Sequence, residues 1–195
     1  MDFITGLPKP EGKGVIMVVV DRVTKYTHFC ALSHAFKAST ISIAFMETIE
    51  KLHGNPKIIV SDRDPIFTGN FWTKLFSCIS TQLAHNSSYH PESDGQTEIV
   101  NKSLEGYLHC FVSDKQTQWI KLFPLAEWWY NTSFHTVTKM TPFMALYGYQ
   151  PPSLTSYLRE NSKVQAVEYH IDHQKQVLQL LKDNLVSAQI RLRLK

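Results

Sequence analysis

A run of six apolar residues, VIMVVV at positions 15–20, constrains the fold of this chain more than any other segment. Because it is rich in β-branched residues and shows no helical stripe, it predicts a strand that is buried on both faces. A second strand is predicted around Tyr26 to Leu32, and a third in the opening MDFITGL, which the turn-rich PKPEGKG joins to the first. The apolar run is far too short to span a bilayer. The core is therefore expected to form around a β-sheet.

Alternating helix and strand patterns follow these strands. Ser39 is predicted to cap a helix in STISIAFMETIEKLHG that Gly54 ends. A short buried strand, KIIVSD at 57–62, ends at an acid, and a helix in FWTKLFSCIS and an extended piece at 81–84 come next. Further helices are predicted at 94–112, 118–130 and 141–147. This order indicates an α/β layered domain with a mixed sheet: strands come first, then a strand between helices, and then a run of helices.

Composition places few limits on function. The 195 residues suffice for one domain with a real core, or for one domain with an appendage. The formal net charge of +3 permits a polyanionic partner without indicating one. Asp2 and the Pro8/Pro10 pair stand where a signal peptide would need apolar residues, so none is expected. The cysteines form no CxxC pair and no zinc-type cluster with histidines, so buried thiols in a reducing compartment are expected at Cys30, Cys78 and Cys110.

A long helix is predicted after the prolines of YGYQPPSL. It begins at Val164 and contains no internal Gly or Pro. Apolar residues fall on heptad core positions, interrupted only by Gln174: Val164, Val167, Ile171, Leu178, Leu181, Leu185, Ala188 and Leu192. Such a stripe is typical of a helix that packs on its own domain or on a second copy. The basic end RLRLK leaves a nucleic-acid contact as the alternative.

Three acids stand out by their position. Asp2 lies in the first predicted strand, Asp62 ends the strand KIIVSD, and Glu98 lies in the first turns of the helix after the loop SSYHPESDGQT. Open α/β sheets present ligands where strands end, so these side chains can meet at one sheet edge. Convergent carboxylates repel one another, and a hard divalent cation such as Mg²⁺ removes that penalty. Two such ions assist an in-line phosphoryl displacement.

Each of these acids also has a simpler explanation. Asp94 is a good N-cap, and Glu98 is favourable in the first helical turn because it faces the positive end of the dipole. The segment Asp62–Asp64 can form a charged turn. Asp21 rivals Asp2, since it ends the strand with the strongest pattern. Spacing alone leaves these alternatives open.

The order and spacing of several motifs resemble one known family. The matching segments are MDFITGLP, VVVDRVTKYTHF, KLHGNPKIIVSDRDPIF, FW..LF, SSYHPESDGQTEIVNKSLEGYL, WWYNTSFH and MTPFMALYG. From Asp2 to Pro152 the chain resembles the integrase catalytic core of gypsy-type LTR retrotransposons, which is similar to that of retroviral integrases. The resemblance implies a ribonuclease-H-like three-layer domain with a mixed five-stranded sheet flanked by helices, plus a long C-terminal helix. It also implies a catalytic and metal-binding triad of Asp2, Asp62 and Glu98.

The activity that this resemblance implies is DNA integration by polynucleotidyl transfer. Integrases of this kind trim the 3′ ends of donor DNA with water, and the freed 3′-hydroxyl then attacks a target phosphodiester. The resemblance implies Mg²⁺ or Mn²⁺, with two ions in the active complex and Asp62 as the acid that bridges them. It implies the element's DNA ends, target DNA and further copies of the chain as partners, with no membrane and no small-molecule cofactor. Action in the nucleus, after synthesis in the cytoplasm, is likewise implied.

Several residues near Glu98 are candidates for DNA contact. Lys102 follows one turn after Glu98 on the same predicted helix face, so it can reach a phosphate. Tyr89, His90 and Ser93 can stack on a DNA end or hydrogen-bond to it. In the aromatic helix further along, helical spacing indicates core packing rather than base stacking for Trp119, Trp128, Trp129 and Tyr130.

Some features depart from the family pattern. Glu92 stands where glutamine is common in the family, and Glu105 stands where retroviral relatives carry lysine. The resemblance further implies a core at residues 1–152 that is truncated at its first strand, and a linker and amphipathic helix at 153–195 that lead toward an absent C-terminal domain. No zinc-binding N-terminal domain is expected either. These departures keep a second hypothesis open: a catalytically silent transposon-derived fragment, or a co-opted module, that binds nucleic acid or self-associates through the Val164–Leu192 helix.

Overall fold

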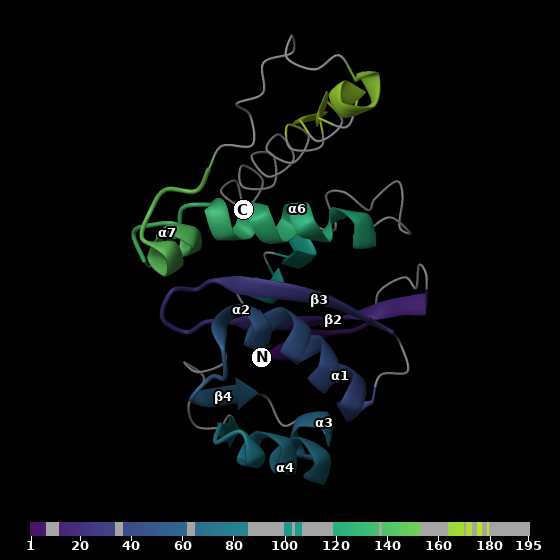
Figure 1. Cartoon of the computed structure of the whole chain (residues 1–195), viewed down its shortest axis with the longest axis vertical. Coiled ribbons are helices and arrows are strands. Elements are labelled where there is room, and N and C mark those ends of the chain that lie inside the picture. Colours follow the sequence, from purple (N-terminus) through teal and green to yellow (C-terminus); the bar gives the residue numbers. More distant parts are fainter. Residues whose placement is uncertain are drawn as a thin grey trace, which may run out of the picture.

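The computed structural model describes residues 1–6, 12–33, 37–61, 65–85, 100–102, 104–106, 119–136, 138–152, 164–169, 171–172, 175–176 and 179. Within them, strands form a central layer with helices on both sides (Figure 1). The order of the described elements is the one that the sequence pattern predicts: three strands, a helix, a strand, helices, a strand, and then helices. The prediction of an α/β layered domain is therefore confirmed.

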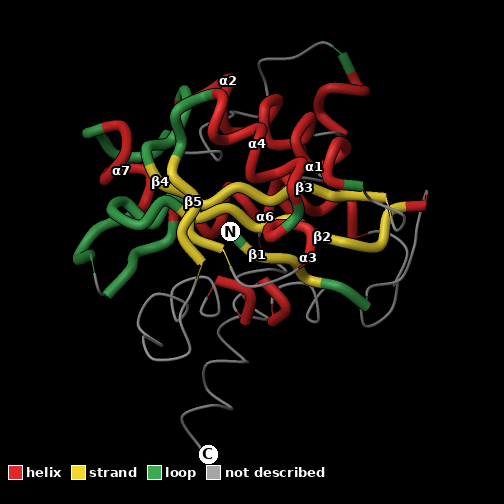
Figure 2. Tube along the Cα trace, turned by 90° about the horizontal axis from the view of Figure 1, so that it is seen from below, coloured by secondary structure: helices red, strands yellow, loops and turns green. Residues whose placement is uncertain are grey.

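The strands of the central layer gather in the middle of the molecule (Figure 2). An antiparallel sheet in the order β1-β2-β3 is built from β1 (Asp2–Ile4), β2 (Lys13–Val20) and β3 (Thr27–Ser33). A parallel pair is built from β4 (Ile58–Ser61) and β5 (Gln82–His85). Each predicted strand is therefore present, with bounds that differ by a few residues.

A backbone hydrogen bond joins the two sheets. The Met1 ammonium donates a hydrogen bond to the backbone oxygen of Val60, in β4, at 2.8 Å. Because Met1 directly precedes β1, this bond sets the beginning of β1 beside β4. The expected mixed five-stranded sheet is thus present as a three-stranded and a two-stranded ladder that meet at this point.

Two apolar cores, one on each face of the strands, explain the layers. Successive side chains of a strand point to opposite faces, so Ile16 and Val18 enter the first core, and Val15 and Met17 enter the second. Helical residues complete the first core with Val100, Leu104, Phe123, Ala126 and Tyr130. They complete the second with Ile41, Phe45, Ile49, Phe67, Trp72 and Phe76. The predicted burial of the VIMVVV run is confirmed for residues 15–18, while positions 19 and 20 are half-buried.

The helix predicted from Ser39 begins earlier and changes its winding. It consists of α1 (Ala38–Phe45), one π-helical turn η2 (Met46–Glu50), and α2 (Lys51–His53). The predicted Ser39 cap is wrong, because Lys37 precedes the first turn with an extended backbone and Ser39 lies inside the helix. Gly54 follows α2 as predicted, with a φ of 73° that glycine adopts without a steric penalty.

The remaining helices cover the outer faces. In Figure 1, α3 (Pro65–Thr68) and α4 (Asn70–Cys78) lie below the strands, and α6 (Trp119–Thr132) and α7 (Pro142–Tyr147) lie above them. Thr141 caps α7, since its hydroxyl oxygen accepts from the backbone N–H of Met144 at 3.1 Å. Residues 100–102 and 104–106 are helical as well, inside the span predicted at 94–112.

The aromatic residues of α6 pack inward, as predicted. Tyr130 is buried, and Trp129 packs against the first core. The Trp128 ring contacts the ring of Phe143 in α7, with their centroids 5.8 Å apart. The side chain of Trp119 lies outside the described residues. Core packing rather than base stacking therefore accounts for the aromatic side chains of α6 that the structure describes.

Other expectations about burial have mixed outcomes. Cys30 is half-buried. The predicted burial of Cys78 is wrong, because α4 buries the side that carries Trp72 and Phe76 and leaves Cys78 exposed. Cys110 lies outside the described residues. Val164 and Val167 are exposed, although the heptad pattern predicts a packed stripe. None of the described helices combines the length and the apolar character needed to cross a bilayer.

Candidate active site

Asp2 is the acid of the predicted triad that lies within the described residues, whereas Asp62 and Glu98 lie outside them. β1 places Asp2 opposite Val18. Its Oδ1 accepts a hydrogen bond from the Phe3 N–H at 2.7 Å, and its Oδ2 accepts one from Asn101 Nδ2 at 2.5 Å. Two donors on different elements therefore fix the orientation of this carboxylate.

The segments that adjoin the other two acids both reach the beginning of β1. Ser61, the residue before Asp62, ends β4 and is 2% exposed, and β4 is bonded through Val60 to Met1. Asn101, three residues after Glu98, donates to Asp2 itself. If Asp2, Asp62 and Glu98 form a triad, the segments next to Asp62 and Glu98 must both lie near Asp2. Both contacts with the beginning of β1 are present among the described residues.

Asn101 is a site residue that the sequence analysis missed. Its Oδ1 is buried and has no hydrogen-bond partner among the described residues. Leaving such an oxygen unpaired costs about 1–3 kcal/mol, and a water or a hydrated cation would satisfy it. The signal in the sequence is the spacing, because a residue three positions after Glu98 shares its face of the predicted helix.

Lys102 is exposed on this helical stretch, whereas Val100 and Leu104 are buried in the first core. The stretch therefore presents Lys102 to solvent, as a phosphate contact would need, and Glu105 is exposed too. The other predicted DNA contacts and the neighbouring acids lie outside the described residues: Tyr89, His90, Ser93, Glu92 and Asp94. Within the described part of the chain, no three His, Cys, Asp or Glu side chains are grouped so as to hold a metal ion.

Asp21, the rival of Asp2, has a structural role in the turn between β2 and β3. Its Oδ2 accepts from the backbone N–H of Thr24 at 2.8 Å and from Thr24 Oγ1 at 2.5 Å. Its own N–H donates to the backbone oxygen of Tyr26 at 2.8 Å. Asp21 lies three residues past Val18, the partner of Asp2, which is about 10 Å along a strand. Turn closure thus accounts for Asp21.

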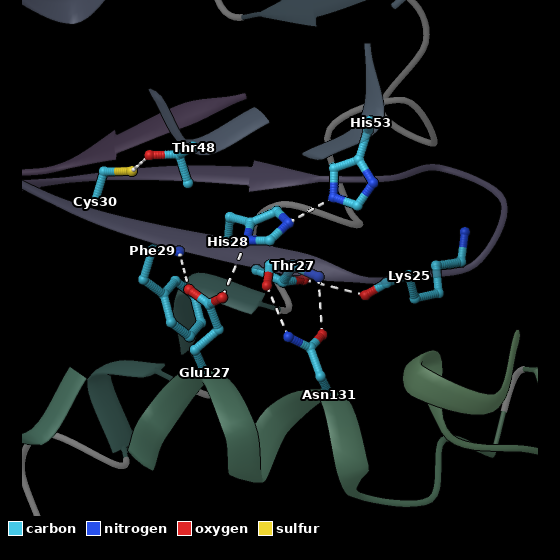
Figure 3. Close-up of polar contacts among 9 residues, drawn as sticks. All are labelled: Lys25, Thr27, His28, Phe29, Cys30, Thr48, His53, Glu127 and Asn131. Atoms are coloured by element: carbon cyan, nitrogen blue, oxygen red, sulfur yellow. Dashed lines mark hydrogen bonds and ion pairs between the residues drawn. The ribbon is translucent and has the colours of Figure 1, made fainter. Parts of the chain in front are cut away.

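A second polar cluster covers the outer edge of β3 (Figure 3). Glu127 and Asn131 lie one turn apart on α6 and point toward this strand. Glu127 Oε2 accepts from the Phe29 N–H at 2.9 Å. Asn131 Oδ1 accepts from the Thr27 N–H at 2.8 Å, and its Nδ2 donates to the Thr27 carbonyl oxygen at 2.8 Å. Two side chains of α6 therefore take the place of a neighbouring strand.

Glu127 also connects to a pair of histidines, and we call His28, His53 and Glu127 the histidine cluster. Glu127 Oε1 lies 3.0 Å from His28 Nδ1, and His28 Nε2 lies 2.9 Å from His53 Nε2 at the end of α2. Both histidines line a cavity of about 400 Å³. Burial, together with the charge of His28, lowers the pKa of His53, and burial is the main cause that raises the pKa of the adjacent Tyr26 hydroxyl. The sequence analysis missed this cluster, whose signal on α6 is the charged Glu127 within an aromatic helix.

Comparison with known proteins shows what the chain as a whole is similar to. No protein-family model matches the chain. The transposon Tf2-3 and Tf2-4 polyproteins of Schizosaccharomyces pombe are each 31% identical to it over 200 residues, which cover 99% of this chain. The chain is a relative of the Tf2 transposon polyproteins. It spans 14% of the length of each of them.

Solved structures relate the fold to retroviral integrases. The simian T-cell lymphotropic virus intasome, in complex with the PP2A regulatory subunit B56 gamma, matches with a TM-score of 0.64 and 17% identity, over 84% of this chain and 58% of that one. The HTLV-2 integrase catalytic core domain, in complex with magnesium, matches with a TM-score of 0.58 and 15% identity, over 74% of this chain and 93% of that one. The predicted resemblance to gypsy-type integrase cores and the ribonuclease-H-like fold are confirmed.

Proposed function

We propose that this chain is an integrase catalytic domain that carries out metal-dependent 3′-end processing and strand transfer on DNA. One observation carries the proposal: the segments next to Asp62 and Glu98 both reach the beginning of β1, where Val60 accepts a hydrogen bond from Met1 and Asn101 donates one to Asp2. The similarity to transposon polyproteins over 99% of the chain supports it. The integrase fold supports it as well.

The side chains of the proposed site fit a hard divalent cation. Asp2, Asp62 and Glu98 offer only oxygen atoms, which suit Mg²⁺ or Mn²⁺ and not zinc. The unpartnered Oδ1 of Asn101 lies on the residue that binds Asp2, where a water of a hydrated ion would satisfy it. When bound, two such ions would lower the pKa of the attacking water or hydroxyl and stabilise the developing charge on the phosphate. The HTLV-2 core, solved with magnesium, is a structural precedent.

The residues of the chain itself position the carboxylates and the DNA. The Phe3 N–H and the Asn101 amide hold Asp2 in one orientation, so less ordering is needed when the substrate binds. Lys102, exposed on the helical stretch that carries Asn101, would neutralise a DNA phosphate. The remaining proposed contacts to the DNA end are Tyr89, His90 and Ser93.

The proposal includes the partners and the place of action. The DNA partners would be the element's own ends and a target duplex, and the chain would act as a homo-oligomer in the nucleus. A core at residues 1–152 would carry the chemistry, and a linker and helix at 153–195 would follow it. A lysine that neutralises one phosphate adds about one released counterion to the salt dependence of binding, so Lys102→Ala should reduce the magnitude of the slope of log K against log salt by about 1.

Strand transfer by the purified chain tests this function. A branched DNA substrate and Mn²⁺ are incubated with the chain and with its Asp62→Asn and Glu98→Gln variants. Each variant replaces a carboxylate oxygen that would bind the metal. Metal binding stabilises the transition state by several kcal/mol, so each variant should lower the rate about 100-fold or more. Thermal unfolding of each variant should stay close to that of the parent chain.

Matched controls remove carboxylates of the same kind elsewhere. Asp21→Asn and Glu105→Gln make the same changes in charge at the β2–β3 turn and on the exposed side of the helical stretch. Both controls should keep most of the strand-transfer rate. Activity that survives Asp62→Asn and Glu98→Gln, or that falls equally in the controls, would contradict the proposed triad.

A further inference from the structure

Two cations lie together on the turn between β2 and β3, outside the proposed triad. Arg22 is exposed, and Lys25 Nζ donates a hydrogen bond to the Arg22 carbonyl oxygen. Among the described residues, neither side chain forms an ion pair. Asp21, the acid beside Arg22 in the chain, directs its Oδ2 to the N–H and the hydroxyl of Thr24. The turn therefore presents two positive charges that no described acid pairs with.

The turn holds this pair of cations in a fixed conformation. The Lys25 N–H donates to the Asp21 carbonyl oxygen at 2.9 Å, and the Asp21 N–H donates to the Tyr26 carbonyl oxygen at 2.8 Å. Lys25 has a φ of 65°, in the left-handed region that favours glycine, so the turn imposes this conformation on the lysine. Burial, and then the charge of Arg22, lower the pKa of Lys25, whereas the charge of Asp21 opposes both. An anion bound beside the two cations would relieve their repulsion.

Exposed tyrosine rings adjoin this turn. Tyr26 follows Lys25, and its ring meets the ring of Tyr147 edge-on, with their centroids 5.8 Å apart. The turn and α7 accordingly lie at the same end of the molecule (Figure 1). Gly148 ends α7 with a φ of 79°, and the rings of Tyr147 and Tyr149 on either side of it have centroids 6.2 Å apart. Tyr147 is 46% exposed and Tyr149 is 58% exposed, so an aromatic surface lies beside the two cations.

We propose that a basic–aromatic patch at this end of the molecule binds an unpaired stretch of DNA. The patch consists of Arg22, Lys25, Tyr147 and Tyr149. The two cations would neutralise phosphates, and the two exposed rings would stack on bases. Cations combined with aromatic rings bind single strands with little preference for sequence, because every base has a face on which a ring can stack. The bases of a duplex are already stacked on one another, so the tyrosines favour an unpaired strand.

This inference rests on the proposed function for the identity of its ligand. Trimming a 3′ end of a duplex removes nucleotides from one strand, so nucleotides of the opposite strand lose their partners. Asp21, which adjoins the patch, lies about 10 Å along β2 from Val18, the strand partner of Asp2. The patch would therefore hold an unpaired strand of the same DNA beside the catalytic site, without taking part in the chemistry.

Binding of a fluorescein-labelled oligothymidine of about twelve nucleotides to the whole chain tests the proposal. Fluorescence anisotropy in EDTA gives the Kd at several salt concentrations. Tyr149→Ala should raise the Kd about 5-fold or more, because it removes a stacking surface. Arg22→Gln and Lys25→Gln should each reduce the magnitude of the slope of log K against log salt by about 0.7, the contribution of one phosphate in a single strand. Tyr149→Ala should leave that slope unchanged, because it removes no charge.

Matched controls make the same changes on α4, on the other side of the strands from α7 (Figure 1). Lys74 is exposed there and Phe71 is 48% exposed, so Lys74→Gln and Phe71→Ala should leave both the Kd and the slope unchanged. Because binding is measured in EDTA, a chain without strand-transfer activity can still bind the oligonucleotide, and an active chain can fail to bind it. A Kd that Tyr149→Ala leaves unchanged would overturn the proposal. Equal weakening of binding to a duplex by Tyr149→Ala would overturn it as well.

Discussion

Asn131 binds the backbone of Thr27 at two points: its Oδ1 accepts from the Thr27 N–H, and its Nδ2 donates to the Thr27 carbonyl oxygen, each at 2.8 Å. Both residues are buried. Because β3 is the outer strand of its sheet, this amide replaces the partner strand that β3 lacks there. Glu127 does the same for the Phe29 N–H. In this way α6 protects an edge that would otherwise be open to pairing with other chains.

Asn131→Ala should lower the free energy of unfolding by about 2–4 kcal/mol. The substitution leaves the N–H and the carbonyl oxygen of Thr27 buried and unpaired, and each unpaired group costs about 1–3 kcal/mol. Urea denaturation measures the change. Asn70→Ala, on the exposed side of α4, is the matched control and should stay within about 0.5 kcal/mol of the parent. Equal stability of the two variants would mean that water replaces the amide at Thr27.

Asn101→Ala should lower the strand-transfer rate about 10- to 100-fold, as loss of a residue that orients a metal ligand does. The free energy of unfolding should change by less than about 1 kcal/mol, because the lost bond to Asp2 is offset by removal of an unpaired buried oxygen. Kinetics and urea denaturation of one preparation separate the two effects. A rate that falls only in proportion to the folded fraction would exclude a positioning role for Asn101.

Asn101→Asp probes the same contact by charge. It places a second carboxylate where the amide lies 2.5 Å from Asp2 Oδ2, and two such carboxylates repel and raise the pKa of one of them. At Mn²⁺ concentrations that do not saturate the site, the variant should therefore lose more activity than Asn101→Ala does. High Mn²⁺ should restore part of the lost activity. Activity equal to that of Asn101→Ala at every Mn²⁺ concentration would argue against the repulsion.

Local patterns predict the layers of this fold because they record burial directly. The β-branched run at 15–20 predicts a strand between two cores, and both cores contain its residues. Helix ends are less predictable, as Ser39 shows: a good capping residue lies inside the first turn because the helix begins at Ala38. The capping preference of one residue is too weak to oppose helical packing around it.

Contacts between distant residues could not be predicted from the sequence alone. Asp2 and Asn101 are 99 positions apart, as are His28 and Glu127, and Thr27 and Asn131 are 104 apart. No periodic pattern links such pairs, because they arise only when α6 and the helical stretch pack on the strands. A family resemblance supplies long-range information, and the triad of Asp2, Asp62 and Glu98 is a prediction that rests on it, whereas the supporting amide of Asn101 was not predicted.

Trp72 tests how the second core tolerates an unpaired donor. Its ring is fully buried against Phe45, Phe67 and Phe76, and its Nε1 has no hydrogen-bond partner among the described residues. Trp72→Phe removes that donor and leaves a small void, so the free energy of unfolding should change by less than about 1.5 kcal/mol. Trp72→Ala should cost about 3–5 kcal/mol through the larger cavity. Urea denaturation distinguishes the two, and equal losses would show that the indole N–H is paired in solution.

The stability of the chain should fall as the pH drops below about 6.5. Burial lowers the pKa of His53 and of His135 from their ordinary value of 6.5, and the charge of His28 lowers that of His53 further. The unfolded chain therefore binds protons at these residues at a higher pH than the folded chain does. Between the two pKa values, falling pH favours unfolding, whereas well above 6.5 both states are neutral there and the effect vanishes. Urea denaturation in EDTA, between about pH 7.5 and about pH 5.5, measures the change.

His135→Gln isolates one of these two groups. In the parent chain the His135 ring donates through Nε2 to the Tyr130 carbonyl oxygen at 3.3 Å, and glutamine keeps an N–H donor while removing the titration. The fall in stability between about pH 7.5 and about pH 5.5 should therefore be smaller in the variant than in the parent chain. Stability that increases toward low pH, or an equal fall in both proteins, would show that His135 is protonated as readily in the folded chain as in the unfolded one.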